Sequence, residues 1–357
     1  MDELIIGGES IARGENRIID LHLPPLTTHT DLEMPVHVIR GKKPGPRLLV
    51  CAAIHGDEIN GVEIIRRLLG RKSWTGLKGD LIAIPIVNMY GFIQQTRYLP
   101  DRRDLNRCFP GSEKGSMAGR LAHIFLNEIV AKCTHGIDLH TAAIHRDNLP
   151  QIRACLSDPE TTRIANAFPV PVLLDADLRS GTIREAAGKM NIPWLVYESG
   201  EALRFDEVAI RAGKRGILQV MRELGMLKKH QPKKVYQPQV ASKSYWVRAS
   251  KSGIFRSLLP MGAHVAKGDL LGVIDDPYGG NEDHMYAPTS GIIIGKTNLP
   301  LVYEGDAITH IARFKSLNDA ADSVEIFQTE LDNMIEDVID DLENEDMDES
   351  VDGAPIQ

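Results

Sequence analysis

The chain has 357 residues, of which 43% are hydrophobic and 25% charged, a balance typical of a water-soluble globular protein. A chain of this length exceeds the size at which a single core stops growing, so we expect two domains. No apolar run approaches the length of a membrane span, and the opening residues MDELIIGGES lack the basic and apolar regions of a secretory signal. These features predict a cytoplasmic protein that makes no membrane contact.

The charge is unevenly distributed along the chain. Fourteen acidic residues and no Lys or Arg lie between Asp322 and Asp352. Their combined charge of −14 is more negative than the formal net charge of −8 of the whole chain, so the remainder of the chain carries a net positive charge. Basic and aromatic residues do not interleave as they do on nucleic-acid-binding surfaces, which favours small anionic molecules over nucleic acid as partners.

The four cysteines, Cys51, Cys108, Cys133 and Cys155, show no CxxC spacing. We therefore expect free thiols in a reducing compartment rather than a metal cluster or a disulfide framework. Cys108 stands beside a motif described below and could contact the functional site.

The first predicted elements are strands. The stretches 18–23 and 36–39 are β-compatible, and a Gly/Pro-rich turn, GKKPGP, precedes the apolar run LLVCAAI that begins at Leu48. The pattern predicts two antiparallel strands followed by one buried strand. That strand stops at the sequence HGDE, after which helical spacing continues to Leu69.

His55 and Glu58 therefore lie at the carboxyl end of a buried strand, where open α/β sheets bind ligands. They offer an imidazole nitrogen and a carboxylate oxygen, and we expect Gly56 to let the backbone turn so that both face one point. A catalytic zinc usually takes three protein ligands. The segment GIDLHT supplies a third in His140, with Asp138 placed to orient it. The predicted site holds one Zn²⁺ per chain.

Between these ligands the sequence predicts a second buried strand, Leu81 to Val87, and a loop from Gly91 to Gly115 that is broken by two prolines. Loops of this length in a compact domain are usually functional. This one contains five polar residues of interest: Arg97, Arg102, Arg103, Asn106 and Arg107. A helix from Met117 to Val130 follows the loop.

The residues after His140 continue the candidate site. His145, Arg146 and Asn148 are close enough to His140 in sequence to line a pocket. Farther on, a helix at 164–168, a strand at 171–174 and a helix at 181–190 are predicted, and Arg184 in the last of these is a candidate second anion contact.

A last apolar strand, Trp194 to Tyr197, is expected to end at Glu198. A carboxylate at a strand end, in the same register as the metal ligands, is what a general base requires. Glu201 is a rival on spacing alone.

We expect the first domain to span residues 1–235, with a linker rich in lysine and proline at 228–239. Residues 243–315 read as an all-β domain similar to the barrel-sandwich fold of biotinyl and lipoyl carrier domains, with Gly262 and Gly268 at turns. The expected attachment hairpin, DHMY, has no lysine, so we expect a structural, oligomerising or lid role. Residues 316–357 form an acidic tail that begins as a helix, with Val324, Phe327, Leu331, Ile335 and Val338 at helical spacing, and ends disordered.

Four motifs in order carry a family resemblance: HGDE at His55, DLNRCFPG at Asp104, DLHTA at Asp138 and YESGE at Tyr197. Each is weak alone, but together they are specific. The chain resembles the succinylglutamate desuccinylase/aspartoacylase family over roughly its first two-thirds. This resemblance implies the zinc carboxypeptidase-like fold, an α/β domain with a mixed central sheet flanked by helices.

The resemblance also implies roles. Asn106 and Arg107 match the pair that holds the carboxylate of the substrate, with Asp104 buttressing them. Arg97 is the best match for the arginine that polarises the scissile carbonyl, although its spacing to DLNR is slightly longer than expected and leaves Arg102 as a competitor. The family pattern of an apolar strand followed by Glu, a small residue and Gly selects Glu198 as the base.

The sequence thus predicts a zinc-dependent hydrolase that removes the acyl group from an N-acyl amino acid or a related small carboxylate. The alternative is a metallocarboxypeptidase that removes C-terminal residues from a peptide or protein. A third hypothesis, a binding or scaffold protein without metal, accounts less well for a complete ligand set and base. Either enzyme is compatible with a homo-oligomer.

Overall fold

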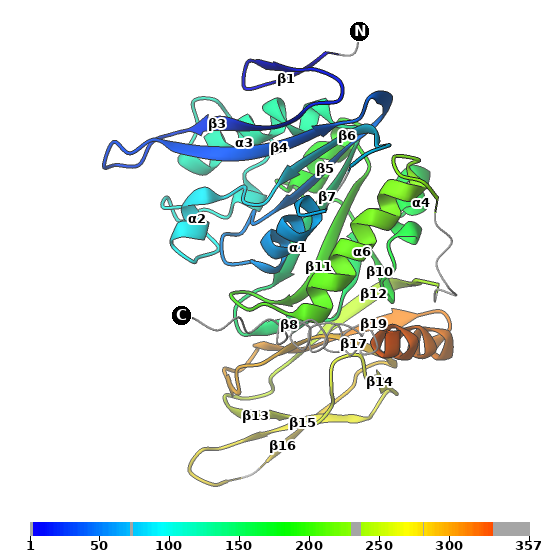
Figure 1. Ribbon diagram of the computed structural model, residues 1–357. Coiled ribbons are helices and arrows are strands. Elements are labelled where there is room, and N and C mark those ends of the chain that lie inside the picture. Colours follow the sequence, from blue (N-terminus) through cyan, green and yellow to red (C-terminus); the bar gives the residue numbers. More distant parts are fainter. Residues whose placement is uncertain (1–2, 72–73, 230–236, 281, 331–357) are drawn as a thin grey trace, which may run out of the picture.

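A computed structural model describes residues 3–71, 74–229, 237–280 and 282–330. A mixed sheet of 13 strands runs through the molecule, with helices on both faces of its upper part and a separate four-stranded antiparallel sheet below (Figure 1). This arrangement confirms the predicted fold class: a mixed α/β sheet with an additional all-β region. In the described part of the chain, none of the helices combines the length and the hydropathy needed to cross a membrane.

The amino-terminal strands form one half of the sheet. They are β3 (Asn16–Leu23), β4 (Leu32–Arg40), β5 (Lys43–Ala52) and β6 (Lys78–Ile84), with β1 (Leu4–Ile6) and β2 (Glu9–Ile11) as a separate hairpin. β3 and β4 pair antiparallel, as predicted, and β5 runs parallel to β6. The apolar run that begins at Leu48 forms the fully buried carboxyl-terminal half of β5, which accounts for its lack of alternation.

The strands that carry the candidate site lie beside β5. They are β7 (His135–Ala142), β9 (Gln151–Ala154), β10 (Val172–Asp175) and β11 (Trp194–Glu201). β7 is parallel to both β5 and β11, so the carboxyl ends of all three strands meet at one edge of the sheet. β11 also pairs with β9, in the antiparallel direction.

Helices cover this part of the sheet on both faces and bury two separate cores. One face carries α1 (Asn60–Leu69), α4 (Pro159–Ala167) and α6 (Glu207–Glu223), and the other carries α3 (Met117–Glu128) and α5 (Ile183–Lys189). The predicted helices are thus present with small shifts at their ends. The predicted long loop contains the end of α2 (Met89–Ile93) and the 3₁₀ turn η1 (Leu105–Arg107). A second 3₁₀ turn, η2 (Val130–Lys132), follows α3.

The all-β region is an extension of the main sheet. Its strands are β12 (Gln239–Arg248), β14 (His264–Val265), β17 (Gly291–Thr297) and β19 (Ala307–Phe314), and the separate sheet holds β13 (Gly253–Ser257), β15 (Leu270–Asp275), β16 (Asp283–Tyr286) and β18 (Leu301–Val302). β12 pairs in parallel with β10, and β17 pairs with the short strand β8 (Arg146–Asn148) that follows the candidate site. The two parts of the chain are therefore joined by backbone hydrogen bonds at two places.

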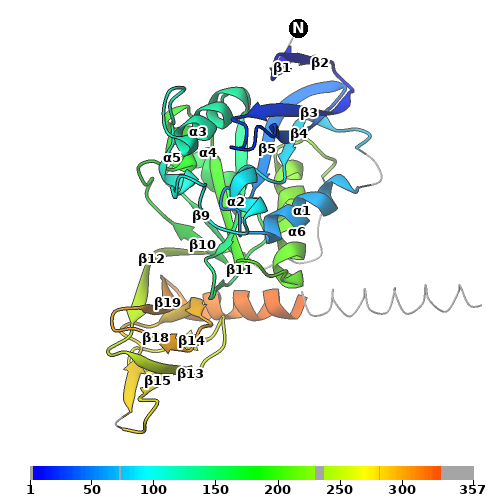
Figure 2. The ribbon, with the colours of Figure 1, turned by 90° about the vertical axis from the view of Figure 1, so that its left-hand side faces the viewer.

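A helix spans residues 317–330 and lies at the junction of the two parts (Figure 2). Val324 and Phe327 are both 2% exposed, and Glu330 forms an ion pair with Arg215 of α6 at 2.9 Å. The start of the predicted tail helix is thus present. The predicted positions Leu331, Ile335 and Val338, and most of the linker around residue 235, lie outside the described residues.

Gly136, at the start of β7, has a structural role in positioning the strand that carries His140. A Cβ atom at Gly136 would lie 2.2 Å from the Cε3 atom of Trp194 on β11, which is its register partner. We expect Gly136→Ala to lower the free energy of unfolding by about 1–3 kcal/mol, because the indole and both strands must shift. Chemical denaturation measures this change.

Gly119→Ala is the matched control for that substitution. Gly119 lies within α3, and a Cβ there would have no neighbour closer than 3.4 Å. Alanine favours helix relative to glycine, so stability should be unchanged or rise by up to about 1 kcal/mol. Equal stability loss in both variants would contradict the packing role given to Gly136.

Candidate active site

The site forms where β5, β7 and β11 end. His55 and Glu58 lie in the turn between β5 and α1, and His140 lies near the end of β7. Glu198 on β11 is the register partner of His140. Because register partners on neighbouring strands project from the same face of a sheet, His140 and Glu198 reach the same cavity.

Gly56 lies in the turn between β5 and α1, as predicted, and it also allows the close approach of another segment. Its backbone does not adopt a positive φ; the left-handed residue in this turn is Ala53, with φ 50°. A Cβ atom at Gly56 would lie 2.0 Å from the carbonyl carbon of Gly91. Gly56 therefore permits the close approach of the loop that carries Arg97, which brings a second segment to the metal ligands.

The predicted ligands converge. Donor atoms of His55, Glu58 and His140 all lie within 4.8 Å of one another, and the three residues are buried. Nδ1 of His55 lies 2.7 Å from Oε1 of Glu58, and Nδ1 of His140 lies 2.7 Å from Oε2 of the same carboxylate. The opposite nitrogens are held by carboxylates: Nε2 of His140 by Asp138 at 2.7 Å, and Nε2 of His55 by Asp104 at 3.0 Å.

This arrangement requires a positive charge at its centre. If each Nε2–H donates to its aspartate, each neutral ring presents a Nδ1 lone pair to Glu58. With both rings protonated instead, burial acts to raise the pKa of Glu58, but the charges of the two imidazolium rings hold that pKa well below its usual range, so the carboxylate is anionic. Two lone pairs and a carboxylate converge favourably only around a proton or a metal cation. The donor set therefore fits a divalent metal ion.

Arg97 completes the immediate surroundings of the ligands. Its Nη1 atom lies 3.0 Å from Glu58, and its Nη2 atom lies 3.0 Å from Asp104. Asp104 also accepts the backbone N–H of Asn106 at 2.9 Å, so it both buttresses the DLNR turn and orients His55. Arg102 is exposed and does not line the cavity. Of the two candidate arginines, Arg97 contacts a predicted metal ligand, and its role in polarising a carbonyl group stays a prediction.

A cavity of about 160 Å³ opens beside the ligands, and we call it the central cavity. Its lining comprises His55, Glu58, Arg97, His140, Thr141, Ala142, Ala143, Arg146, Asn148, Arg153, Glu198 and Trp246. His145, which was also considered, does not line it.

Glu198 stands in the wall of the central cavity. Nδ2 of Asn148 donates to one of its oxygens at 3.0 Å, and Nε of Arg153 lies 3.6 Å from the other. The prediction that Glu198 ends its strand is wrong, because β11 continues to Glu201 through a shift in register. Glu201 instead accepts the backbone N–H of His145 at 2.9 Å and the side-chain amide of Asn298 at 2.9 Å, and it does not line the cavity.

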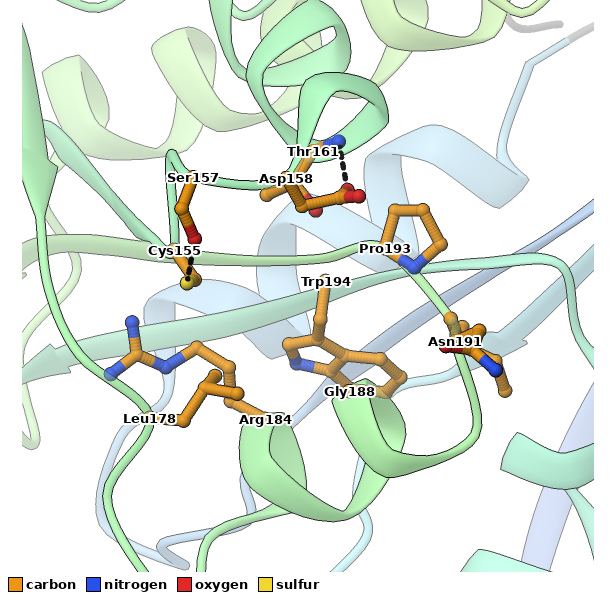
Figure 3. Close-up of a pocket in the computed structure, with 11 residues that line it drawn as sticks. Cys155, Ser157, Asp158, Thr161, Leu178, Arg184, Gly188, Asn191, Pro193 and Trp194 are labelled. Carbon is orange, nitrogen blue, oxygen red and sulfur yellow. Dashed lines mark hydrogen bonds between the residues drawn. The ribbon is translucent and has the colours of Figure 1, made fainter.

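Three predicted substrate contacts lie outside the lining of the central cavity. Asn106 accepts the backbone N–H of Ile183 at 3.0 Å, and Arg107 donates to the carbonyl of Asn106. Arg184 donates to the carbonyls of Ala176 and Asp177 and lines a second pocket, of about 260 Å³, with Cys155 and Trp194 (Figure 3). Their roles in substrate binding stay predictions.

Three polar or aromatic residues of the lining were not predicted: Thr141, Arg153 and Trp246. The backbone N–H of Thr141 donates to Glu58 at 3.2 Å. Arg153 lies on β9 opposite Val196 of β11, and Val196 is two positions before Glu198. The alternation of side chains along the short strand β9 is the only sequence signal that could have placed Arg153 in the site. Trp246 comes from the all-β region, and no sequence pattern connects it with His140.

Comparison with known proteins relates the chain to one enzyme family. Residues 44–224 match the family described as the succinylglutamate desuccinylase/aspartoacylase catalytic domain. A curated relative, the N-alpha-acetyl-L-2,4-diaminobutyric acid deacetylase of Halomonas elongata, is 26% identical over 296 residues, which cover 78% of this chain and 85% of that protein.

Solved structures share the fold across both parts of the chain. A succinylglutamate desuccinylase/aspartoacylase from Rhodobacter sphaeroides superposes with a TM-score of 0.77 and 26% identity, covering 85% of this chain and 96% of that one. The ectoine utilization protein EutE (DoeB) from Ruegeria pomeroyi superposes with a TM-score of 0.76 and 24% identity over 85% and 96% of the two chains.

Asp138 provides a test of the metal centre that leaves the ligands in place. Asp138→Asn replaces the carboxylate that orients His140 with an amide, so we expect metal affinity to fall by roughly 10–100-fold. Competition titration with a metal-binding dye measures this affinity. Asp20→Asn, an exposed aspartate on β3, is the control. Equal affinities in the two variants would contradict the orienting role of Asp138.

Proposed function

Because this chain belongs to the succinylglutamate desuccinylase/aspartoacylase family, we propose that it is a zinc-dependent hydrolase that cleaves the amide bond of an N-acyl amino acid or a related small carboxylate. One observation carries the proposal. The buried triad of His55, Glu58 and His140 opens into a cavity whose wall presents the Glu198 carboxylate. A metal site with a separate carboxylate beside it is the constellation of a metal-assisted hydrolase.

Zinc is the metal that the donor set favours. Two imidazoles and one carboxylate form a His₂Glu set, which in catalytic zinc sites leaves a position open for water or substrate. The carboxylates behind both rings, of Asp104 and Asp138, are the partners that such imidazoles require. Bound there, Zn²⁺ would polarise a carbonyl group and lower the pKa of water toward neutrality.

The side chains around the three metal ligands supply the general base and the stabilisation of negative charge. Glu198 is the general base that takes a proton from the attacking water and returns it to the departing amine. Asn148 donates a hydrogen bond to one of its oxygens, and Arg153 forms an ion pair with the other, which favours one direction of the carboxylate. Arg97 lines the cavity beside Glu58 and would stabilise negative charge on the carbonyl oxygen as the tetrahedral species forms.

The size of the central cavity favours a small substrate over a polypeptide. Its volume is about 160 Å³, and Trp246 from the all-β region forms part of its wall. A carboxypeptidase needs room for a chain that continues beyond the scissile bond, so we favour deacylation. The Halomonas relative is named a deacetylase of an N-acetylated amino acid, which also supports this class. The family resemblance assigns the carboxylate of the substrate to Asn106 and Arg107, with Arg184 as a candidate further contact; all three lie outside the lining of the central cavity, so a substrate that reaches them would extend beyond it.

The four cysteines are all free thiols. This state suits a reducing compartment. We therefore keep the prediction of a cytoplasmic enzyme.

Glu198→Gln tests the proposed base. The amide keeps the size and one hydrogen-bonding oxygen but cannot accept the proton, so we expect kcat to fall by roughly 100-fold or more while zinc content stays at one ion per chain. Turnover of N-acetyl and N-succinyl amino acids and metal analysis by mass spectrometry provide the two readouts. Glu201→Gln is the matched control and should retain most of the activity. Activity retained by Glu198→Gln would reject the assigned base.

Removal of the metal tests the cofactor separately. Treatment with a chelator should abolish turnover and lower the melting temperature, because Glu58 and the two imidazoles then lose the cation that compensates their buried polar atoms. Readdition of Zn²⁺ should restore both properties, and Mg²⁺ serves as the control because it prefers oxygen ligands. Full activity in metal-free protein would exclude a zinc enzyme.

A further inference from the structure

Arg146 is placed in the wall of the central cavity by the junction between the two parts of the chain. It lies on β8, paired with Thr297 of β17, and its guanidinium stands 5.3 Å from the ring centroid of Trp246 on β12. Such a distance is within the range of a cation–π contact. Arg146 and Trp246 both line the cavity, so the contact is made at its surface.

The indole of Trp246 also stacks on a second ring. The imidazole of His310 on β19 lies parallel to Trp246, with ring centroids 4.5 Å apart and an interplanar angle of 8°. Burial, together with the nearby charge of Arg153, lowers the pKa of His310 to about 3, so this ring is neutral at physiological pH. A neutral ring fixes the orientation of Trp246 without adding positive charge behind it. The all-β region thus supplies a rigid aromatic support for Arg146.

The charges of the cavity leave Arg146 without an acidic partner. Glu58 is engaged by the two imidazoles and Arg97, and Glu198 is engaged by Asn148 and Arg153. No ion pair between residues described by the structure includes Arg146. A guanidinium that stands at a cavity wall without an ion-pair partner can donate two parallel N–H bonds to the carboxylate of a bound ligand.

We propose that Arg146, positioned by Trp246, is a specificity-determining residue that selects substrates with a second carboxylate over those with a neutral or cationic group at the same place. This inference rests on the proposed function and narrows its substrate class. The second carboxylate can belong to the acyl group or to the amino acid, since the chemistry recognised by Arg146 is the same. The substrate of the Halomonas relative is named for 2,4-diaminobutyric acid, whose side-chain amine is cationic and would be repelled by Arg146.

Steady-state kinetics of the zinc-loaded enzyme test this preference. The four substrates are N-acetyl-L-aspartate, N-succinyl-L-alanine, N-acetyl-L-alanine and N-alpha-acetyl-L-2,4-diaminobutyrate. We expect at least one of the two dianions to exceed N-acetyl-L-alanine by roughly 10–100-fold in kcat/KM, the range of a hydrogen-bonded charge pair, with the diaminobutyrate compound slowest. The better dianion shows which side of the scissile bond faces Arg146.

Variants assign the preference to the Arg146–Trp246 pair. Arg146→Gln should bring the ratio of dianion to N-acetyl-L-alanine close to one, chiefly through KM. Trp246→Phe keeps an aromatic face and should retain part of the ratio, whereas Trp246→Leu should lose it. Arg256→Gln, which removes an exposed arginine from β13 in the separate sheet, is the matched control and should keep the wild-type ratio. Melting temperatures report folding, and the Arg146 variant decides the question if Trp246→Leu does not fold.

Calorimetric binding of succinate and acetate separates this inference from the proposed hydrolysis. Wild-type protein should bind succinate at least tenfold more tightly than acetate, and Arg146→Gln should lose that difference. Absence of turnover with all four substrates, together with Arg146-dependent succinate binding, would reject the proposed function and keep the anion site. Turnover with the same substrate ratios in wild type and Arg146→Gln would overturn the role of Arg146.

Discussion

The structure of the site depends on the carboxylate of Glu58, which lies between two imidazoles at 2.7 Å from each. An ionised carboxylate this deeply buried is costly unless its neighbours compensate it. Here the compensation comes from His55 in the same turn and from two distant segments, which carry His140 and Arg97. Two further carboxylates, Asp104 and Asp138, fix the outer nitrogens of the rings. The fold of the α/β part brings these segments together, and the metal expected at their centre would balance the remaining negative charge.

Parallel pairing explains how segments so far apart in sequence meet. β5, β7 and β11 point the same way, so whatever follows or ends each strand appears at the same edge. The register of the strands then sets which side chains share a face of the sheet. Glu198 of β11 pairs with His140 of β7, and Val196, two positions before Glu198, pairs with Arg153 of β9. A slip of one residue in β11 would turn Glu198 away from the cavity. The accuracy of the site is therefore a property of strand register as much as of the ligands.

The same logic defines what the sequence could reveal. His55, Glu58, His140 and Glu198 each follow or interrupt an apolar run, a pattern that is visible in one dimension and predicts a shared edge. The sequence places Gly56 in a turn but does not reveal that Gly91 approaches it closely, because no local pattern encodes that long-range contact. The continuation of β11 to Glu201 was missed because SGE reads as a turn; Gly200 does adopt a positive φ, but the strand pairs with β7 again at Glu201 after a shift in register. Trp246 reaches the cavity only through the pairing of β12 with β10 and β19.

That last pairing gives the all-β region a defined part in the chemistry. A lid joined by a flexible linker alone would close the cavity without determining its shape, since its side chains would take many positions. Here β12 pairs with β10 of the main sheet, and β17 pairs with β8. The backbone hydrogen bonds between these strands fix the positions of Trp246, Arg146 and Asn148. The residue that orients the proposed base, Asn148, pairs with Gly295, where a Cβ would lie 3.0 Å from its side-chain oxygen. The all-β region therefore shapes both the wall of the cavity and the direction of Glu198, which makes it an integral part of the candidate active site.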